Sequence, residues 1–368
     1  MSVQLHSRVL QRAPQSTRAI MLQVMLACTP GILLSVWFFG YGIVLNIVLA
    51  SAFALFTEAV ILSVRARNWW QGLQDNSALV TAVLFGIAVP PGLPWWLVAT
   101  GIVFAIAIVK HSFGGLGQNP FNPAMSGYLL LLLAYPLDMT AWHVPATRLF
   151  DDTAISTLGW YGLQQSLLAS FPGLPLPSAT SLPAIDGLAM ATPLIEFKMA
   201  ATSALLSARE SGLSFFARES GTGWELVNFG YLLGGLYLLA RRIISWHIPV
   251  SIIGTVALLA TLLYAPNSFA IYGTPYLHLF GSATMLGAFF IATDPVSAAT
   301  TRRGQLLYGV CIGLGIYCIR VWGSYLDSVA IAVLFGNLCA PLLDHWCRPT
   351  IYGHGARQLP VTGGEWKA

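Results

Sequence analysis

Long apolar stretches separated by short polar turns limit most strongly how this chain can fold. A helix that crosses the hydrocarbon layer of a membrane needs about 20 apolar residues, and fewer where protein shields it. Only 9% of the residues are charged, against about 25% in a soluble domain. The sequence therefore predicts an all-α polytopic membrane protein with about ten transmembrane helices. The candidate spans are 20–38, 43–64, 78–90, 95–110, 124–136, 226–240, 248–265, 277–292, 305–321 and 328–343.

The basic residues of the short loops predict the orientation of these spans. All of them fall on one side of the membrane if the N-terminus starts there, whereas the opposite turns at 40–42, 90–94 and 323–327 contain no Lys or Arg. The positive-inside rule then places both termini in the cytoplasm. The loop residues counted are Arg65, Arg67, Lys110, Arg241, Arg242, Arg302 and Arg303.

A long polar interval divides the spans into two sets of five. With the predicted orientation this interval lies outside the cytoplasm, as a large loop or small cap between spans five and six. We therefore expect a cytoplasmic N-terminal segment, a first five-helix half, an extracytoplasmic cap, a second five-helix half and a cytoplasmic tail. Their ranges are 1–19, 20–136, 137–225, 226–343 and 344–368.

The third span of each half carries a short repeat. "SALVTAVLFGIAVPP" begins at Ser77 and "SATMLGAFFIATDP" at Ser282. Both begin with Ser-Ala, and both place a phenylalanine eight residues on and a proline thirteen residues on. The two spans cross the membrane in opposite directions, so the repeat favours two inverted halves, an arrangement that commonly forms a site near the membrane midplane. A match of four positions also arises easily by chance in sequence rich in small residues.

Two Asn-Pro steps stand out in "FGGLGQNPFNPAMSGYL", at Asn119 and Asn122. They forbid a regular helix, and non-helical backbone at this depth needs protein or a cavity to satisfy its polar groups. One interpretation is a pocket lined by the Asn amides and free backbone N–H groups. The other is a re-entrant turn that only joins two helices.

Two carboxyl groups also suggest function. Asp294, in "FFIATDPVSAATTRRGQ" after Thr293, either binds a cation or ring nitrogen or is a turn acid beside Arg302 and Arg303. Glu58 lies inside the second span with no Lys or Arg within helical reach. A carboxyl in the membrane indicates a proton or ion step, or a neutral group hydrogen-bonded to a neighbour. The histidines near span ends are expected to be interfacial anchors: His111, His247, His278 and His345.

Several classes of chemistry find no support in the sequence. There is no nucleotide-binding glycine pattern, Walker lysine or nucleophile elbow, and no basic run typical of nucleic-acid binding. None of the five cysteines forms a C-x-x-C pair, so no metal or iron–sulfur site is expected, and no catalytic residue is assigned.

A threonine ahead of a proline closes the stretch "IDGLAMATPL" in the polar interval. The sequence from 193 to 210 predicts a helix that begins with proline in its first turn. Thr192 would then be an ordinary helix N-cap.

Four motifs together resemble a family of flavin-carrying membrane proteins from the Rnf electron-transport complex and the sodium-pumping NADH:quinone reductase, where its members are the D and B subunits respectively. They are "GQNPFNPAMSGY" at 117–128, "DGLAMATPL" at 186–194, "GAFFIATDPVSA" at 287–298 and "APLLDHWCRPTIYGHG" at 340–355. They occur in the expected order over most of the chain.

The resemblance implies a covalent cofactor. In this family a threonine in an Asp-Gly-x-Ser/Thr-x-Ala-Thr setting carries FMN through a phosphoester bond, which a flavin transferase installs. Asp186, Gly187 and Ala191 match the attachment motif, and Thr192 is the expected FMN-carrying residue. Position 189 departs from the pattern, because alanine stands there in place of a hydroxyl residue. A helix N-terminus at residue 193 would favour the phosphate.

The resemblance also implies a second, noncovalent flavin (riboflavin) and a set of partners. Asn119, Asn122, Thr293 and Asp294 are the candidate surroundings of that flavin, and Glu58 is the candidate ion-pathway residue. The implied role is electron relay in an ion-translocating ferredoxin:NAD oxidoreductase of the bacterial inner membrane, coupled to Na⁺ or H⁺ movement. An iron–sulfur subunit and a second subunit with covalent FMN are implied, and the chain is not expected to be an enzyme alone. The alternative from the residues is a small-solute transporter or channel without a redox role.

Overall fold

Four long apolar helices form the frame of the bundle in a computed structural model that describes residues 16–143, 159–172, 189–190, 222–264, 274–323 and 327–348. By length and composition each is able to cross a membrane. Most of the exposed side chains along these helices are apolar, which suits contact with lipid. The four are α1 (Thr17–Phe39), α2 (Gly42–Val64), α17 (Arg302–Val321) and α18 (Val329–Trp346).

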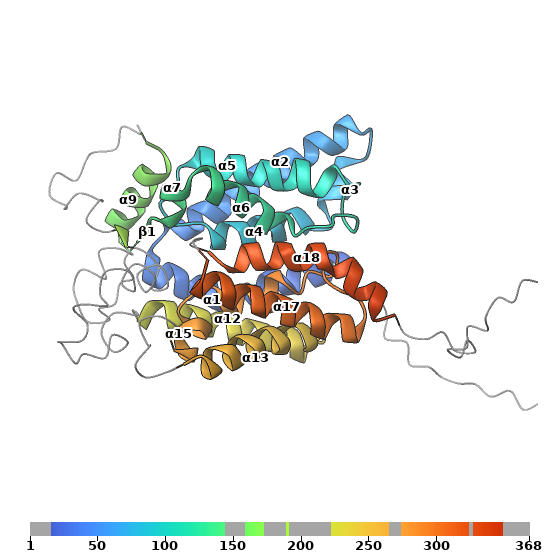
Figure 1. Ribbon diagram of the computed structural model, residues 1–368. Helices are drawn as coiled ribbons and strands as arrows, with labels where there is room; N and C mark the ends of the chain where they lie inside the picture. The colour runs from blue at the N-terminus through green and yellow to red at the C-terminus, as the bar shows by residue number, and fades with distance from the viewer. Residues whose placement is uncertain are drawn as a thin grey trace, which may run out of the picture.

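Further apolar helices pack with the long ones to complete the bundle (Figure 1). They are α4 (Ser77–Ala88), α5 (Trp95–Val103) with its π-helical continuation η1 (Phe104–His111), α6 (Pro123–Ala134), α12 (Thr222–Ala240) and α13 (His247–Leu262). Each of these elements overlaps one predicted span. The coarse prediction of an all-helical membrane protein is therefore confirmed for the described residues.

The predicted span 277–292 is not one continuous helix. That span is divided into α15 (Pro275–Phe280), α16 (Thr284–Leu286) and the π-helical η4 (Gly287–Ile291). Asn228 of α12 holds both sides of the break, because its Nδ2 donates to the Phe280 carbonyl oxygen at 2.9 Å and its Oδ1 accepts from the Met285 N–H at 3.4 Å. A side chain 52 residues away in sequence thus replaces helix hydrogen bonds that the break removes.

The N-terminal helices α1–α6 and the C-terminal helices α12–α18 meet where α1 packs along α12. Glycines let the two backbones approach closely, since a Cβ added at Gly230 would lie 3.0 Å from the Cα of Gly31. Small residues at such crossings are typical of helix packing in membranes. Elsewhere α2 packs on α4, and α13 on α17.

Small elements gather at the two ends of the bundle. The helices α7 (Pro136–Thr140) and α9 (Trp160–Ser170) and the strand β1 (Trp142–His143) lie at one end, and α3 (Trp69–Leu73) lies at the other (Figure 1). β1 pairs antiparallel with β2 (Ala189–Met190), with Trp142 opposite Met190. The predicted helix 193–210 and the attachment motif residues Asp186, Gly187, Ala191 and Thr192 lie outside the described residues.

Candidate functional site

Two cavities lie at opposite ends of the contact between the N-terminal and C-terminal helices. The first, here called the glycine-loop cavity, has a volume of about 110 Å³ and is lined by the start of α1 and the end of α12. The second, here called the strand-side cavity, measures about 80 Å³ and is lined by the end of α1 and the start of α12. Both exceed the small voids normally left by side-chain packing.

The glycine-loop cavity brings together the four residues predicted as flavin surroundings. It is walled by apolar side chains of α4 and η4, with a few polar groups that converge on it from separate elements. A mostly apolar wall with a small set of polar groups is typical of cofactor sites. The polar wall residues are Ser77, Thr81, Lys110, Asn119, Asn122, Thr293 and Asp294.

The Asn-Pro segment is both a turn and part of the cavity wall. Asn122 caps α6, because its Oδ1 accepts from the Met125 N–H at 3.2 Å, and its Nδ2 donates to the Ile291 carbonyl oxygen at 3.2 Å. Asn119 Nδ2 donates to the Phe121 carbonyl oxygen at 2.9 Å. Both asparagines are buried. Asn122 therefore fixes the start of α6 against the end of η4, where the C-terminal helices close the cavity.

The glycines before this segment have backbone conformations that other residues rarely adopt. The φ angles of Gly114, Gly115 and Gly117 are +122°, +108° and +89°. A side chain at any of these positions would strain the loop. The glycines therefore allow the chain to turn from η1 into the cavity wall over a few residues.

Asp294 has the turn role that the sequence left open, and it also lines the cavity. Ser297 Oγ donates to its Oδ2 at 2.8 Å, and the Val296 N–H donates to its Oδ1 at 3.4 Å. Burial raises the pKa of the Asp294 carboxyl above its ordinary value, although these hydrogen bonds oppose part of the rise. Its neighbour Thr293, in the turn after η4, donates to the Phe289 carbonyl oxygen at 2.6 Å.

Glu58 is paired with a cation from another helix. Lys110 Nζ lies 2.6 Å from Glu58 Oε1 and donates to Ser77 Oγ at 2.7 Å, and Ser77 Oγ donates to Asp75 Oδ1 at 2.7 Å. His111 Nε2 lies 3.5 Å from the same Glu58 oxygen. A hydrogen-bonded chain therefore connects a buried carboxylate to the polar turn before α4.

This cluster corrects two sequence-based expectations. Lys110 was counted as a loop charge, but it lies in the last turn of η1 and is only 2% exposed. His111 and His278 are buried rather than interfacial, whereas His345 is exposed as expected for an anchor and His247 is half-buried. The sequence missed the pairing because Glu58 and Lys110 are 52 residues apart, beyond any helical spacing rule.

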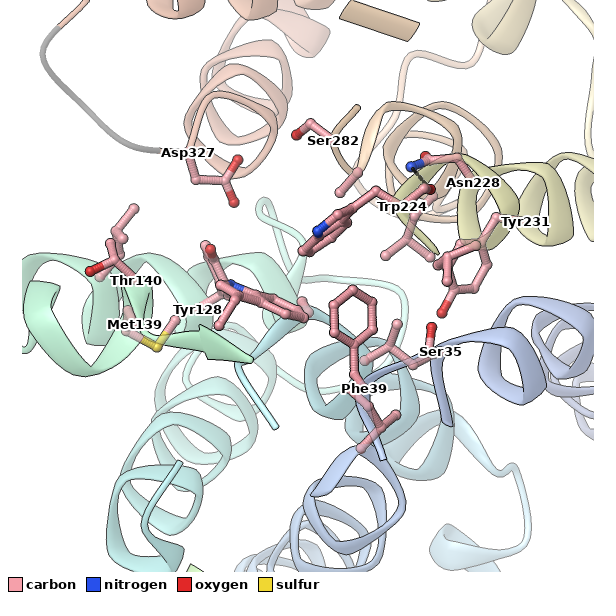
Figure 2. A pocket seen from close by; sticks show the side chains of 18 residues that line it. Ser35, Phe39, Tyr128, Met139, Thr140, Trp224, Asn228, Tyr231, Ser282 and Asp327 are labelled. Carbon is pink, nitrogen blue, oxygen red and sulfur yellow. Dashed lines mark hydrogen bonds between the residues drawn. The ribbon is translucent and has the colours of Figure 1, made fainter. Parts of the chain in front are cut away.

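The strand-side cavity is walled by aromatic rings (Figure 2). Trp224 lies 4.8 Å from Phe39 and 4.9 Å from Trp142 between ring centroids, in tilted and edge-on arrangements. Tyr128 and Asp327 line the same cavity on another side, and Figure 2 shows both side chains directed towards its centre. None of these side chains is a site residue predicted from the sequence, although Tyr128 ends the motif at 117–128.

β2 connects this cavity to the predicted attachment motif. Its partner strand contains Trp142, which lines the strand-side cavity, and β2 ends at Met190. The described strand β2 thus lies within the predicted attachment motif, and it pairs with a strand that contributes Trp142 to the cavity wall.

A second buried cation lies at the strand-side end. Arg320 is fully buried, and its guanidinium donates to Ser328 Oγ at 2.9 Å, to Thr284 Oγ1 at 2.9 Å and to the His278 carbonyl oxygen. Through these hydrogen bonds Arg320 links α15, α16 and the start of α18. Arg320 is not part of the strand-side cavity wall.

The closing motif "APLLDHWCRPTIYGHG" contributes a clamp at the end of α18. The Asp344 carboxylate accepts four hydrogen bonds of 2.8–2.9 Å, from the N–H and hydroxyl groups of Thr300 and Thr301. Thr301 in turn caps α17 through the Gly304 N–H. Asp344 thus fixes the end of the connection between η4 and α17, a segment that also contains Asp294.

These features define an integral membrane bundle with a buried polar or aromatic site at each end. The chain matches the model of the NQR2, RnfD, RnfE family over residues 4–353. It is 47% identical over 345 residues to the D subunit of the ion-translocating oxidoreductase complex of Yersinia enterocolitica serotype O:8, covering 92% of this chain and 95% of the relative. The protein of the same name from Aeromonas salmonicida is 48% identical over 345 residues, with the same coverage. The chain therefore belongs to the NQR2, RnfD, RnfE family.

Proposed function

We propose that this chain is the D subunit of an ion-translocating electron-transport complex, relaying electrons through bound flavin in the inner membrane. Its relatives are named as D subunits of an ion-translocating oxidoreductase complex, and the match covers 95% of their length. The two cavities at opposite ends of one bundle are the observation that supports a relay, because two separate sites are what an electron relay between two flavins needs. As a subunit, the chain acts only within the oxidoreductase complex.

The proposed topology has ten spans in two inverted five-helix halves, with both termini cytoplasmic. The repeat supports it, since Ser77 lines the glycine-loop cavity and Ser282 lines the strand-side cavity. With this orientation the glycine-loop cavity faces the cytoplasm and the strand-side cavity faces the periplasm. The attachment threonine then lies on the periplasmic side.

Thr192 is the proposed site of covalent FMN, through a phosphoester bond. The strand-side cavity suits a planar ring, because its Trp and Phe walls offer stacking surfaces and polar side chains from several elements lie around them. The pairing of β2 with β1 supports this assignment, since it holds the chain before Thr192 at that cavity. When bound, the isoalloxazine supplies the electron-transfer chemistry, and the protein supplies position and electrostatics.

The glycine-loop cavity is the proposed site of a second, noncovalent flavin, riboflavin. Asn119, Asn122, Thr293 and Asp294 would hold its polar edge. The fit rests on the donor set, because amides, hydroxyls and a carboxyl match a ring edge of alternating carbonyl and N–H groups. The apolar side chains of α4 and η4 suit the rest of the ring.

Glu58 is the proposed residue of an ion step, with Na⁺ or H⁺ as the ion. It lies in the membrane beside Lys110 and His111, and its Oε2 is buried without a hydrogen-bond partner among the described residues. The proposed partners are an iron–sulfur subunit, a second covalent-FMN subunit and membrane lipid. A flavin transferase would load Thr192 during maturation.

Mass spectrometry of the peptide that contains Thr192 tests the covalent flavin. Protein from a host with the flavin transferase should carry the mass of FMN on this residue, and Thr192→Val should carry none. Fluorescence of the denatured band gives a second readout. An unmodified peptide from the assembled complex would contradict the proposal and favour a small-solute transporter, for which two opposed cavities would also be suited.

A further inference from the structure

Lys110 has a hydrogen-bond donor that the described part of the chain leaves unused. An ammonium group carries three N–H donors. One donates to Glu58 Oε1 and another to Ser77 Oγ, and among the described residues no third acceptor is recorded. Because Lys110 also lines the glycine-loop cavity, the third donor is available to a ligand there.

The surroundings hold this ammonium group in place. Glu58 and Ser77 fix the nitrogen from two elements, α2 and the start of α4, and all three side chains are buried. Glu58 is absent from the cavity wall, so the cation stands between the carboxylate and the cavity. A donor that is already charged and positioned costs little rearrangement when a ligand binds.

The other buried cation has a different arrangement. Arg320, like Lys110, lies near the end of a long helical segment and donates to a hydroxyl at the start of a short helix, in its case Thr284. Its three recorded bonds go to protein groups, and it does not line the strand-side cavity. Of the two cations, only Lys110 therefore adds a positive donor to a cavity wall.

We propose that Lys110 is a ligand-binding residue of the glycine-loop cavity, donating a charge-assisted hydrogen bond to an acceptor atom of the second flavin. This inference rests on the proposed riboflavin site and adds a residue to it. A cationic donor interacts more strongly with an electron-rich ring than with an electron-poor one. Lys110 therefore favours the reduced form of the ligand over the oxidised form.

The test uses the purified complex carrying Glu58→Gln together with Lys110→Met. The double change avoids leaving a buried charge without its partner. Thr57→Val is the matched control, because Thr57 is buried next to Glu58 and its hydroxyl donates only to the Phe53 carbonyl oxygen of its own helix. Riboflavin is removed and titrated back, and its dissociation constant and midpoint potential are measured.

We expect the double variant to bind oxidised riboflavin about tenfold more weakly, as the loss of a charged hydrogen bond implies. Binding of reduced riboflavin should weaken more than binding of the oxidised form. The midpoint potential of the bound flavin then falls by about 30 mV for each tenfold by which the loss of affinity for the reduced form exceeds that for the oxidised form. Thr57→Val should match the wild type. Equal weakening of both forms would show a purely structural effect and overturn the proposal.

Two further outcomes separate this inference from the proposed function. If the wild-type complex holds riboflavin and the double variant binds it with unchanged affinity and potential, Lys110 is not a binding residue, and the riboflavin site stands. If the wild-type complex holds and rebinds no noncovalent flavin, the proposed riboflavin site fails and the role of Lys110 fails with it.

Discussion

Removing one member of the Glu58–Lys110 pair is expected to destabilise the protein more than removing both. At 2.6 Å and an effective dielectric constant of about 20, the attraction is worth about 6 kcal/mol. Each ion loses several kcal/mol of hydration on burial, so the pair as a whole is close to neutral in free energy. A single change leaves the hydration loss of the remaining ion without compensation.

We therefore expect Lys110→Met or Glu58→Gln to lower the free energy of unfolding by about 3–5 kcal/mol each. The double variant should lose about 2 kcal/mol or less, because no unpaired charge remains. The double-mutant cycle then gives a coupling energy of several kcal/mol between the two side chains.

Equilibrium unfolding in mixed micelles measures the free energy of unfolding of the wild type, the two single variants and the double variant. Thr57→Val is the control. The control should lie within about 1 kcal/mol of the wild type, since its hydroxyl serves only its own helix. If the double variant loses as much free energy of unfolding as the two single variants together, the reasoning is refuted, because the two charges then do not interact. Single variants as stable as the wild type would refute it as well.

Three further predictions concern packing and hydrogen bonding. Gly234→Ala should cost about 1–3 kcal/mol, because its new methyl group meets a carbonyl oxygen of α1, whereas Gly254→Ala, with no atom within 4 Å, should be neutral in a thermal unfolding assay. Asp344→Ala should cost about 2 kcal/mol or more, since it leaves the donors of Thr300 and Thr301 unpaired, and Asp344→Asn should recover part of that loss. Burial raises the pKa of Asp294 above its ordinary value of 3.8, so the wild type loses stability as pH rises from 3.8 through the raised pKa and the buried carboxyl ionises. Asp294→Asn cannot ionise and should therefore gain stability relative to the wild type over that range. A pH-independent difference between the two proteins in unfolding scans would contradict this.

The membrane spans were predictable because they depend on a local property, the length of apolar sequence. The α1, α2, α17 and α18 boundaries lie within a few residues of the predicted ones. The partner that stabilises the break in 277–292 was not predictable in the same way, because Asn228 comes from α12. A run of apolar residues does not reveal a hydrogen-bond partner that comes from another helix.

The candidate site shows the same limit. Asn119, Asn122, Thr293 and Asp294 stood out because polar residues and prolines at the ends of apolar spans need a structural reason. The sequence alone did not predict Lys110 as a residue of the cavity wall, since a lysine between two spans is usually a loop charge. Its burial depends on Glu58 and Ser77, which approach it only in the folded bundle.

One turn of packed apolar side chains separates the two cavities. On α4, Leu84 lines the glycine-loop cavity and Ile87 the strand-side cavity. Three residues of helix rise about 4.5 Å. Leu286 and Phe289 divide the opposite wall in the same way. These four side chains are apolar, so an ion passing between them would lose its water without a polar group from them in exchange. Electrons exchanged between ligands in the two cavities need no such opening. The proposed relay therefore needs no opening of the bundle, whereas an ion step by this route requires these apolar side chains to separate.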